Sequence, residues 1–281
     1  MVLRFGISQV HGGSTVTEGA RAFAHALETL VGKPVRLHVV KDYASLLSTL
    51  RLGGIELAWM PPFLHIEAAR TGAMLAAVVE RDGALTYRSA LVVRADDPIR
   101  ALDELRGARA AWTDRSSASG FVFPRLHLLG AGLNLREALA EETFLGAPRE
   151  VCGAVADGRA DIGACFTSEA HAGDLAQTLV DVGRIYPAAT WRLRVLAVTA
   201  AIPSDGIVLA PTVAPIDRAR IVDALLRLSS LPEGAEGVKK LLFGERLVGV
   251  TDGVARAIER LAPLLRQHGD WRSSSISTVP A

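Results

Sequence analysis

Short aliphatic runs alternate with amphipathic stretches along the first 80 residues, and this alternation restricts the possible fold more than any other feature of the chain. Extended runs at 34–40, 55–59 and 74–80 are separated from one another by stretches of helical periodicity. Strands that alternate with helices in this way form βαβ units on a mainly parallel sheet. The pattern therefore predicts an α/β fold in which helices flank the sheets.

Several helix boundaries can be read from capping residues. Thr15 and Glu18 have the spacing of a capping box, and Gly32 ends the apolar periodicity that follows them. Asp42 is placed to cap a second helix with one apolar face, which Gly53 ends. These signals place the first two helices between the first three strands.

The length and two long extended runs indicate two lobes. A chain of 281 residues is long for one domain of average size. The runs at 85–94 and 190–199 are long enough to cross between lobes, and a new strand–helix series lies between them. The predicted boundaries are 1–88 and 191–270 for an outer lobe, 89–190 for an inserted lobe, and 271–281 for a flexible tail.

The charge balance argues against two classes of partner. The chain has 31 basic and 30 acidic residues, so it lacks the basic field that nucleic acid or an anionic membrane would attract. No apolar run approaches the roughly 20 residues that span a bilayer. We therefore expect no nucleic-acid partner and no insertion into a membrane.

No sequence pattern predicts a metal, a cofactor or a catalytic group. The seven histidines lack paired metal-ligand spacing, and neither a glycine-rich phosphate loop nor a nucleophile elbow occurs. Cys152 and Cys165 are thirteen positions apart, which is no metal spacing either. We predict that they are buried thiols, with a disulfide or a reactive thiol as the alternatives.

The start of the chain reads directly as a strand, with no visible export signal. We expect a cytoplasmic protein if this is the native start. If the chain is a mature exported form, we expect it in the periplasm or another extracytoplasmic compartment.

The most informative segment for function is DRSSASG, residues 114–120, which leads from a predicted strand into a predicted helix. Backbone N–H groups at a helix start, together with the positive end of the helix dipole, attract anions. The hydroxyls of Ser116, Ser117 and Ser119 would add donors at the same point, and Gly120 would let a ligand approach the backbone. The plainer alternative is that one serine only caps the helix.

Polar residues also follow other predicted strands, at the end where open α/β sheets gather ligands. Gln9 and His11 follow the first strand, and Thr167 and Glu169 follow the strand at 161–166. Each is a candidate for ligand contact, although each is also an ordinary residue for a loop.

The segment at 114–120 resembles the Asp-Pro-Ser-Ser-Thr-Ser-Gly segment of the phosphonate-, phosphite- and phosphate-binding proteins of ABC importers. Further similar segments follow the order of that family, from about residue 3 to residue 210. They are the helix start at Asp42, GGIELAWMPPF at 53–63, YRSALVVRADDPI at 87–99, LDELRG at 102–107, AVADGRADIG at 154–163, and Ile202 with Asp205.

The resemblance implies a type II periplasmic-binding-protein fold, in which two α/β lobes are joined by two crossover strands and hold a small anionic ligand in the cleft between them. It implies a receptor and not an enzyme, with an ABC permease as partner if the chain is exported, and we expect a monomer. In the family the serine turn holds the phosphonate oxygens, which implies this role for Ser117 and Ser119. Tyrosines that match Tyr43 and Tyr87 border the ligand there.

Three departures from the family pattern alter the expected site. Ala118 replaces the usual threonine, which keeps the backbone N–H but removes a hydroxyl. Arg149 occupies a place where the family often has an acidic residue for a ligand amine, so it would disfavour an aminophosphonate and favour further negative charge. Pro62 belongs to a Met-Pro-Pro segment that replaces Tyr-Gly-Pro and changes the cleft wall.

Two other function classes stay open on the sequence. One is a cofactor-biosynthesis enzyme of the menaquinone or thiamine type on the same fold, for which His11, Glu169 and Asp114 would have to supply acid–base groups. The other is a cytoplasmic sensory domain in which ligand binding signals instead of serving transport.

Overall fold

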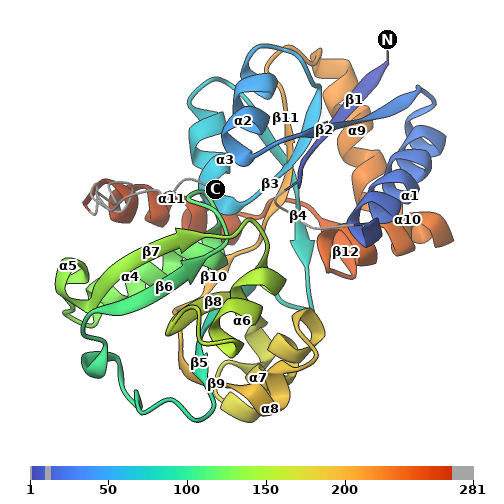
Figure 1. Ribbon diagram of the computed structural model, residues 1–281. Helices are drawn as coiled ribbons and strands as arrows, with labels where there is room; N and C mark the ends of the chain where they lie inside the picture. The colour runs from blue at the N-terminus through green and yellow to red at the C-terminus, as the bar shows by residue number, and fades with distance from the viewer. Residues whose placement is uncertain (1, 10–13, 268–281) are drawn as a thin grey trace. The chain divides into compact units, whose positions relative to one another are not determined.

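The computed structural model describes residues 2–9 and 14–267 and divides into two compact units (Figure 1). Unit 1 comprises Met1–Thr86 and Pro203–Ala262, and unit 2 comprises Tyr87–Ile202 together with the chain from Pro263. The chain thus passes between units at 86/87, at 202/203 and at 262/263, whereas the sequence predicted 88/89 and 190/191. The predicted tail at 271–281 and the candidate His11 lie outside the described residues.

Unit 1 contains a six-stranded sheet in the order β12-β4-β11-β3-β1-β2. Strand β1 pairs in parallel with β2 on one side and with β3 on the other. Strand β11 lies antiparallel between β3 and β4, and β12 pairs antiparallel with the outer side of β4. The strands are β1 (Leu3–Ser8), β2 (Val35–Val40), β3 (Leu57–Met60), β4 (Met74–Glu80), β11 (Gly206–Leu209) and β12 (Arg246–Val248).

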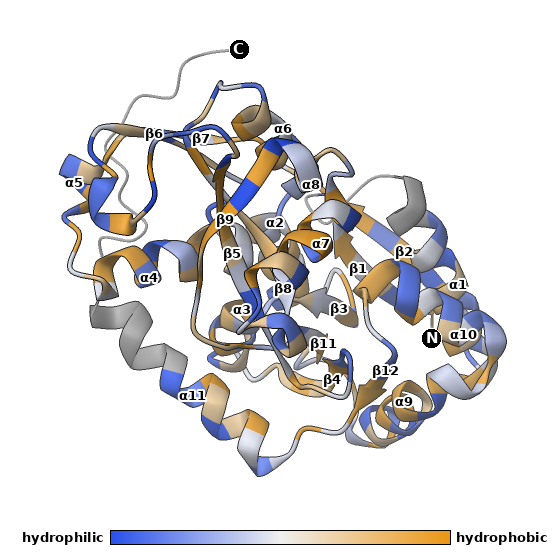
Figure 2. Cartoon of the chain, turned by 90° about the horizontal axis from the view of Figure 1, so that it is seen from below, coloured by the Kyte–Doolittle hydropathy of each residue, from blue (hydrophilic) through white to orange (hydrophobic). Residues whose placement is uncertain are grey.

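Helix α2 begins at its predicted cap, whereas α1 begins at Ser14 and so includes the predicted cap Thr15, although it ends before Gly32 as predicted. Asp42 caps α2 by accepting a hydrogen bond from the Ser45 N–H at 2.8 Å, and this bond lowers the pKa of the Asp42 carboxyl. Helix α2 buries the four apolar side chains that its periodicity selects. The helical segments are α1 (Ser14–Val31), α2 (Tyr43–Arg51), α3 (Pro62–Ala69), α9 (Pro215–Arg227), η5 (Leu228–Ser230), α10 (Pro232–Gly237), η6 (Val238–Leu242) and α11 (Asp252–Gln267). The part of α11 that Figure 2 colours carries both hydrophobic and hydrophilic residues.

Unit 2 contains a second sheet in the order β10-β5-β8-β6-β7, with β9 also paired to β5. Strand β6 is parallel to β7 and to β8, while β5 is antiparallel to β8 and to β9. Both predicted crossing segments are strands of this sheet. The strands are β5 (Thr86–Arg94), β6 (Ala108–Trp112), β7 (Leu139–Phe144), β8 (Ile162–Ser168), β9 (Leu193–Val198) and β10 (Ile202–Pro203).

One core cluster of unit 2 lies where α6 packs on β8. A Cβ added to Gly163 would lie 2.7 Å from Val151, so the glycine is what lets the helix approach the strand. Cys152 and Cys165 belong to this cluster, and both are free and buried, which confirms the prediction. The helical segments are η2 (Leu102–Glu104), η3 (Ala118–Val122), α4 (Phe123–Gly130), α5 (Leu135–Ala138), α6 (Pro148–Ala156), η4 (Glu169–His171), α7 (Leu175–Ile185) and α8 (Ala189–Arg192).

Two sheets flanked by helices confirm the predicted α/β class, but both sheets are mixed and not mainly parallel. The parallel strands are those that short βα units connect, as the periodicity predicts. The antiparallel strands β11 and β12 come from the last third of the chain, and local periodicity holds no information about which strands they will join.

Within residues 2–9 and 14–267, no helix is both long enough and apolar enough to cross a membrane.

Candidate ligand-binding site

The serine-rich turn of unit 2 connects β6 to a helix, as the sequence predicts. The Ser117 side chain caps that helix by accepting a hydrogen bond from the Gly120 N–H at 3.1 Å. Asp114 holds the preceding residues, because its carboxylate accepts from the Ser116 N–H at 2.7 Å and its carbonyl accepts from the Ser117 N–H at 2.9 Å. The first turn is π-helical and continues into α4.

The turn leaves hydrogen-bond donors available at the helix start. The N–H groups of Ala118 and Ser119 are too close to the start to have acceptors within the helix. The Ser117 oxygen accepts from Gly120, so its own proton remains free to donate to another group. Ser89 on β5 donates to the Ser119 carbonyl at 2.6 Å and fixes the turn to the sheet. Such a group of neutral donors can bind an oxyanion.

Ala118 and Gly120 are both buried in the turn. The Ala118 side chain is 2% exposed and supplies no donor. A Cβ added to Gly120 would lie 2.3 Å from the Thr113 hydroxyl oxygen and 2.7 Å from the Ser117 hydroxyl oxygen. The structure therefore gives Gly120 a packing role against these two hydroxyls, whereas the sequence suggested close approach by a ligand.

The segment that follows β7 lies beside the serine-rich turn. The Gly146 N–H donates to the Thr113 carbonyl at 2.9 Å, which brings the start of α6 next to the end of β6. Arg149 is the second residue of α6 and is exposed, and Ala147 in front of the helix offers no side-chain cap. Arg115 lies over the Phe144 ring at 4.4 Å from its centroid. Two cationic side chains thus belong to this edge of the sheet.

Tyr87 and Glu169 reach the same edge of unit 2 from its other strands. Tyr87 is 8% exposed and lies opposite Ser168, the last residue of β8. Glu169 accepts from Arg88 through Nε at 3.0 Å and Nη2 at 2.8 Å, both to the same carboxylate oxygen. The carboxylate is therefore already paired with an arginine.

Thr167 is held in a polar network below this edge. It is fully buried, and its hydroxyl donates to Asp181 at 2.8 Å. The same oxygen of Asp181 accepts from His171 Nδ1 at 2.9 Å and from the Ser168 N–H at 3.0 Å. Burial opposes the charge of Asp181, but these hydrogen bonds outweigh it and lower its pKa. The structure thus gives the Thr167 hydroxyl a partner in the core, Asp181.

Unit 1 presents a different set of residues at the carboxyl ends of β1, β2 and β3. Gln9 follows β1 and is exposed. Tyr43 opens α2, is 5% exposed, and lies with its ring centroid 6.1 Å from that of Trp59. Pro62 is buried in the first turn of α3. The fold thus gathers these three predicted residues at one edge of one sheet.

A buried charged network at this edge of unit 1 had no signal in the sequence. Arg81 donates to Asp205 at 2.8 Å, and Trp59 Nε1 donates to the other carboxylate oxygen of Asp205. Nearby, His65 is 4% exposed and bonds to the Met60 carbonyl at 2.7 Å; burial lowers its pKa to about 4. The partners are separated by up to 146 positions, which is why no local pattern reveals them.

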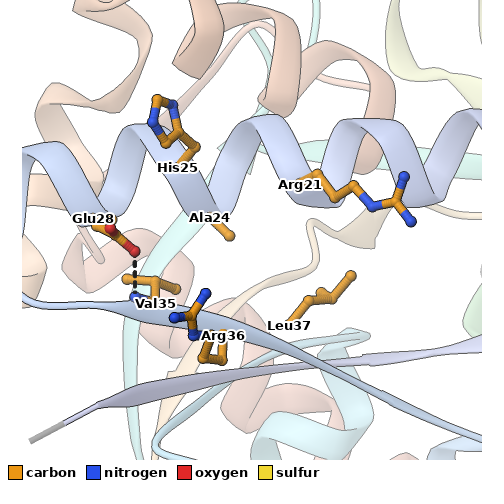
Figure 3. A pocket seen from close by; sticks show the side chains of 7 residues that line it. All are labelled: Arg21, Ala24, His25, Glu28, Val35, Arg36 and Leu37. Carbon is orange, nitrogen blue, oxygen red and sulfur yellow. Dashed lines mark hydrogen bonds between the residues drawn. The ribbon is translucent and has the colours of Figure 1, made fainter.

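A surface hollow of about 300 Å³ lies between α1 and the beginning of β2 in unit 1 (Figure 3). The acidic side chain that lines it, Glu28, is hydrogen-bonded within the protein, because its carboxylate accepts from the Val35 N–H at 2.8 Å. The hollow is at the amino end of β2, away from the carboxyl ends where the predicted residues gather. We therefore do not assign it as the ligand site.

Two of the three residues named for the enzyme alternative have partners within the protein, and the third, His11, lies outside the described residues. Glu169 is paired with Arg88, and Asp114 accepts hydrogen bonds within its own turn. No group of three or more histidine, cysteine or carboxylate side chains in the described chain could hold a metal ion.

Comparisons with known proteins agree with this picture. A family model described as "ABC transporter, phosphonate, periplasmic substrate-binding protein" matches residues 5–252. The phosphonates-binding periplasmic protein of Escherichia coli is 24% identical over 85% of this chain and 70% of its own length. The phosphate-import protein PhnD of Mycolicibacterium smegmatis is 28% identical over 57% of this chain, and the match spans only about half of that protein, 52%.

The solved structures include the binding protein component of an ABC phosphonate transporter from Pseudomonas aeruginosa. It superimposes with a TM-score of 0.79 at 17% identity, over 99% of this chain and 90% of that one. At this identity the likeness concerns the fold, which is that of two-lobed periplasmic binding proteins. Since the family model covers most of the sequence, the chain belongs to the phosphonate-binding family of periplasmic substrate-binding proteins of ABC transporters.

Proposed function

We propose that this protein binds a small phosphorus oxyanion, a phosphonate or phosphate, at the serine-rich turn of unit 2 and delivers it to an ABC permease. The observation that carries the proposal is the group of donors at the start of η3: the hydroxyls of Ser117 and Ser119 and the N–H groups of Ala118 and Ser119. The relatives, a phosphonates-binding protein and a phosphate-import protein, support a ligand that contains phosphorus.

The chemistry of the turn suits a doubly or singly charged oxyanion. All its available groups are neutral donors, so the ligand would supply the charge and the helix start would stabilise it. Arg115 and Arg149 add positive charge at the same sheet edge. Arg88 pairs with one oxygen of Glu169, and the other oxygen is buried without a hydrogen-bond partner among the described residues, so this carboxylate offers one acceptor against the positive charge of Arg115 and Arg149. The site therefore favours phosphate or an alkylphosphonate over an aminophosphonate.

The family places its members outside the cytoplasm, as the substrate-binding components of transporters. We propose the same location and the same kind of partner for this chain. A receptor of this class binds its ligand without transforming it, so we expect no turnover of the bound oxyanion. We also expect a monomer.

The proposal is tested by calorimetry and thermal shift with phosphate, phosphite, methylphosphonate, 2-aminoethylphosphonate and sulfate. A ligand at about 100 times its Kd stabilises the folded state by about 2.7 kcal/mol. We expect phosphate or methylphosphonate to bind more tightly than 2-aminoethylphosphonate, and sulfate to bind weakly. Absence of binding by every phosphorus oxyanion at millimolar concentration would refute the proposal.

Variants locate the site. Ser117→Ala and Ser119→Ala each remove one hydrogen bond to a charged group, about 1.5–3 kcal/mol, so each should weaken binding by roughly 10- to 150-fold. The matched control is Ser230→Ala, an exposed serine of η5 whose hydroxyl bonds only to the Arg227 carbonyl. If Ser117→Ala and Ser119→Ala both bind the ligand as tightly as the Ser230→Ala control, the ligand binds elsewhere.

A further inference from the structure

The Thr113 side chain follows β6 directly and carries a buried hydroxyl that has no partner among the described residues. The residue is 3% exposed. Its backbone is fully engaged, since its N–H donates to the Gly120 carbonyl at 3.2 Å and its carbonyl accepts from Gly146. Only the hydroxyl is left over, and a buried unpaired hydroxyl carries a desolvation cost that valine, with the same shape, would avoid.

This hydroxyl is directed at the serine-rich turn. The hydroxyl oxygens of Thr113 and Ser117 both lie within 2.7 Å of one point, the position that a Cβ on Gly120 would occupy. Because residue 120 is glycine, no side-chain atom separates the two oxygens. A hydrogen bond between the two hydroxyls needs only that a side chain rotate to bring the oxygens to about 2.8 Å, because no side chain of residue 120 stands between them.

We propose that Thr113 is a positioning residue for the Ser117 hydroxyl when the turn binds its oxyanion, an inference that rests on the proposed function. In the bound state the Thr113 hydroxyl donates to the Ser117 oxygen. That oxygen then accepts from both Thr113 and the Gly120 N–H, which uses its two lone pairs. The one proton of Ser117 is then directed away from both of these donors and is available to the ligand.

Two features of this chain make such support useful. Where the family usually has threonine, Ala118 contributes no hydroxyl. The turn therefore has one side-chain donor fewer than the usual family turn, and oxyanion binding depends more on Ser117. A hydroxyl that accepts hydrogen bonds is also a stronger donor, since hydrogen bonds in a chain polarise one another. Thr113 thus strengthens a ligand contact without touching the ligand.

The test compares Thr113→Val with Thr113→Ser by calorimetry, with methylphosphonate and inorganic phosphate as probes. Valine keeps the shape and removes the hydroxyl, and we expect about a 10-fold loss of affinity for whichever probe binds the native protein. Serine keeps the hydroxyl, so we expect affinity within about threefold of the native value. If valine makes the protein hard to obtain, Thr113→Ala against Thr113→Ser gives the same comparison. Thr143→Val is the matched control, because its hydroxyl bonds to the Ala110 carbonyl within the sheet and we expect unchanged affinity.

A double-mutant cycle separates positioning from general damage. In a Ser117→Ala background the Thr113 hydroxyl has nothing to orient, so Thr113→Val should cause almost no further loss. Equal losses in both backgrounds, or native affinity of Thr113→Val, would overturn the inference. If Ser117→Ala weakens binding and Thr113→Val does not, only this inference fails. If Ser117→Ala has no effect, or neither probe binds the native protein, the proposed function fails together with it.

Discussion

The two units treat charge differently at the carboxyl ends of their strands. In unit 1, Asp205 is buried and both of its carboxylate oxygens are engaged, one by Arg81 and the other by Trp59. In unit 2, the serine-rich turn contains neutral donors, and the proton of Ser117 and the N–H groups at the helix start remain available.

The difference reflects the cost of burying charge. A buried carboxylate must be paired, because desolvation of an unpaired charge costs several kcal/mol. Such a pair is complete within the protein and has little left for a ligand. Neutral donors at a helix start cost less to leave unpaired than a buried charge does, and they can bind an anion that arrives. The comparison therefore supports a structural role for the network of unit 1 and agrees with the proposal that the turn of unit 2 binds the ligand.

The largest expected effect is on the network of unit 1. Asp205→Asn removes the charge that pairs with Arg81, and loss of one partner of a buried pair lowers the free energy of unfolding by about 3–5 kcal/mol. Urea denaturation measures this change. Asp223→Asn is the control, since its pair with Arg227 is exposed and should contribute less than about 1 kcal/mol. A loss for Asp205→Asn as small as that of the control would contradict the structural role.

The second effect is a loss of stability at acidic pH. Burial lowers the pKa of His65 from 6.5 to about 4, so the unfolded chain binds this proton more readily than the folded protein does. The contribution of His65 to the free energy of unfolding is therefore fully present above pH 6.5. It falls by about 3 kcal/mol as the pH drops towards 4. The lowered pKa of Asp181 in unit 2 acts only at lower pH, as that carboxylate protonates below its ordinary range. Denaturation curves of His65→Gln should lack most of the slope between pH 6.5 and 4; an unchanged slope would contradict the assignment.

Gly120→Ala tests the packing of the turn. The added methyl would lie 2.3 Å from the Thr113 hydroxyl, and overpacking of this kind costs about 1–3 kcal/mol. We expect lower stability together with at least a 10-fold weaker affinity for the oxyanion, because the Ser117 hydroxyl must move. Gly130→Ala is the control at the end of α4, where no atom lies within 4 Å of an added Cβ, and it should be neutral or slightly stabilising. Native stability and affinity in Gly120→Ala would show that the turn tolerates a side chain.

The smallest effect is expected at Arg149. Its side chain is exposed, and exposed charges contribute roughly 0.2–1 kcal/mol, so Arg149→Ala should weaken oxyanion binding by no more than about fivefold. The effect should shrink as salt is added. Arg136→Ala, an exposed arginine on α5, should not change affinity. A loss far above fivefold, or one that salt leaves unchanged, would mean that Arg149 contacts the ligand directly.

The sequence predicted the elements that depend on local signals. The strand at 74–80 has the predicted bounds, and Asp42 caps the helix whose buried face was read from its periodicity. It did not predict α7, and it did not place β11 between β3 and β4. A four-residue strand has too little periodicity to reveal its partners, and its position depends on contacts with residues far away in the chain.

What the sequence by itself determined about this protein is the family and the serine-rich turn, because a strand end, a capping serine and a helix start are neighbours along the chain. Only the tertiary structure decided which polar groups are already satisfied. The hydroxyl of Thr167, a candidate for ligand contact, donates to Asp181, and the hydroxyl of Thr113, which no sequence pattern singled out, lies buried beside Gly120. Hydrogen-bond partners come from distant segments, so the availability of a donor is a property of the folded chain.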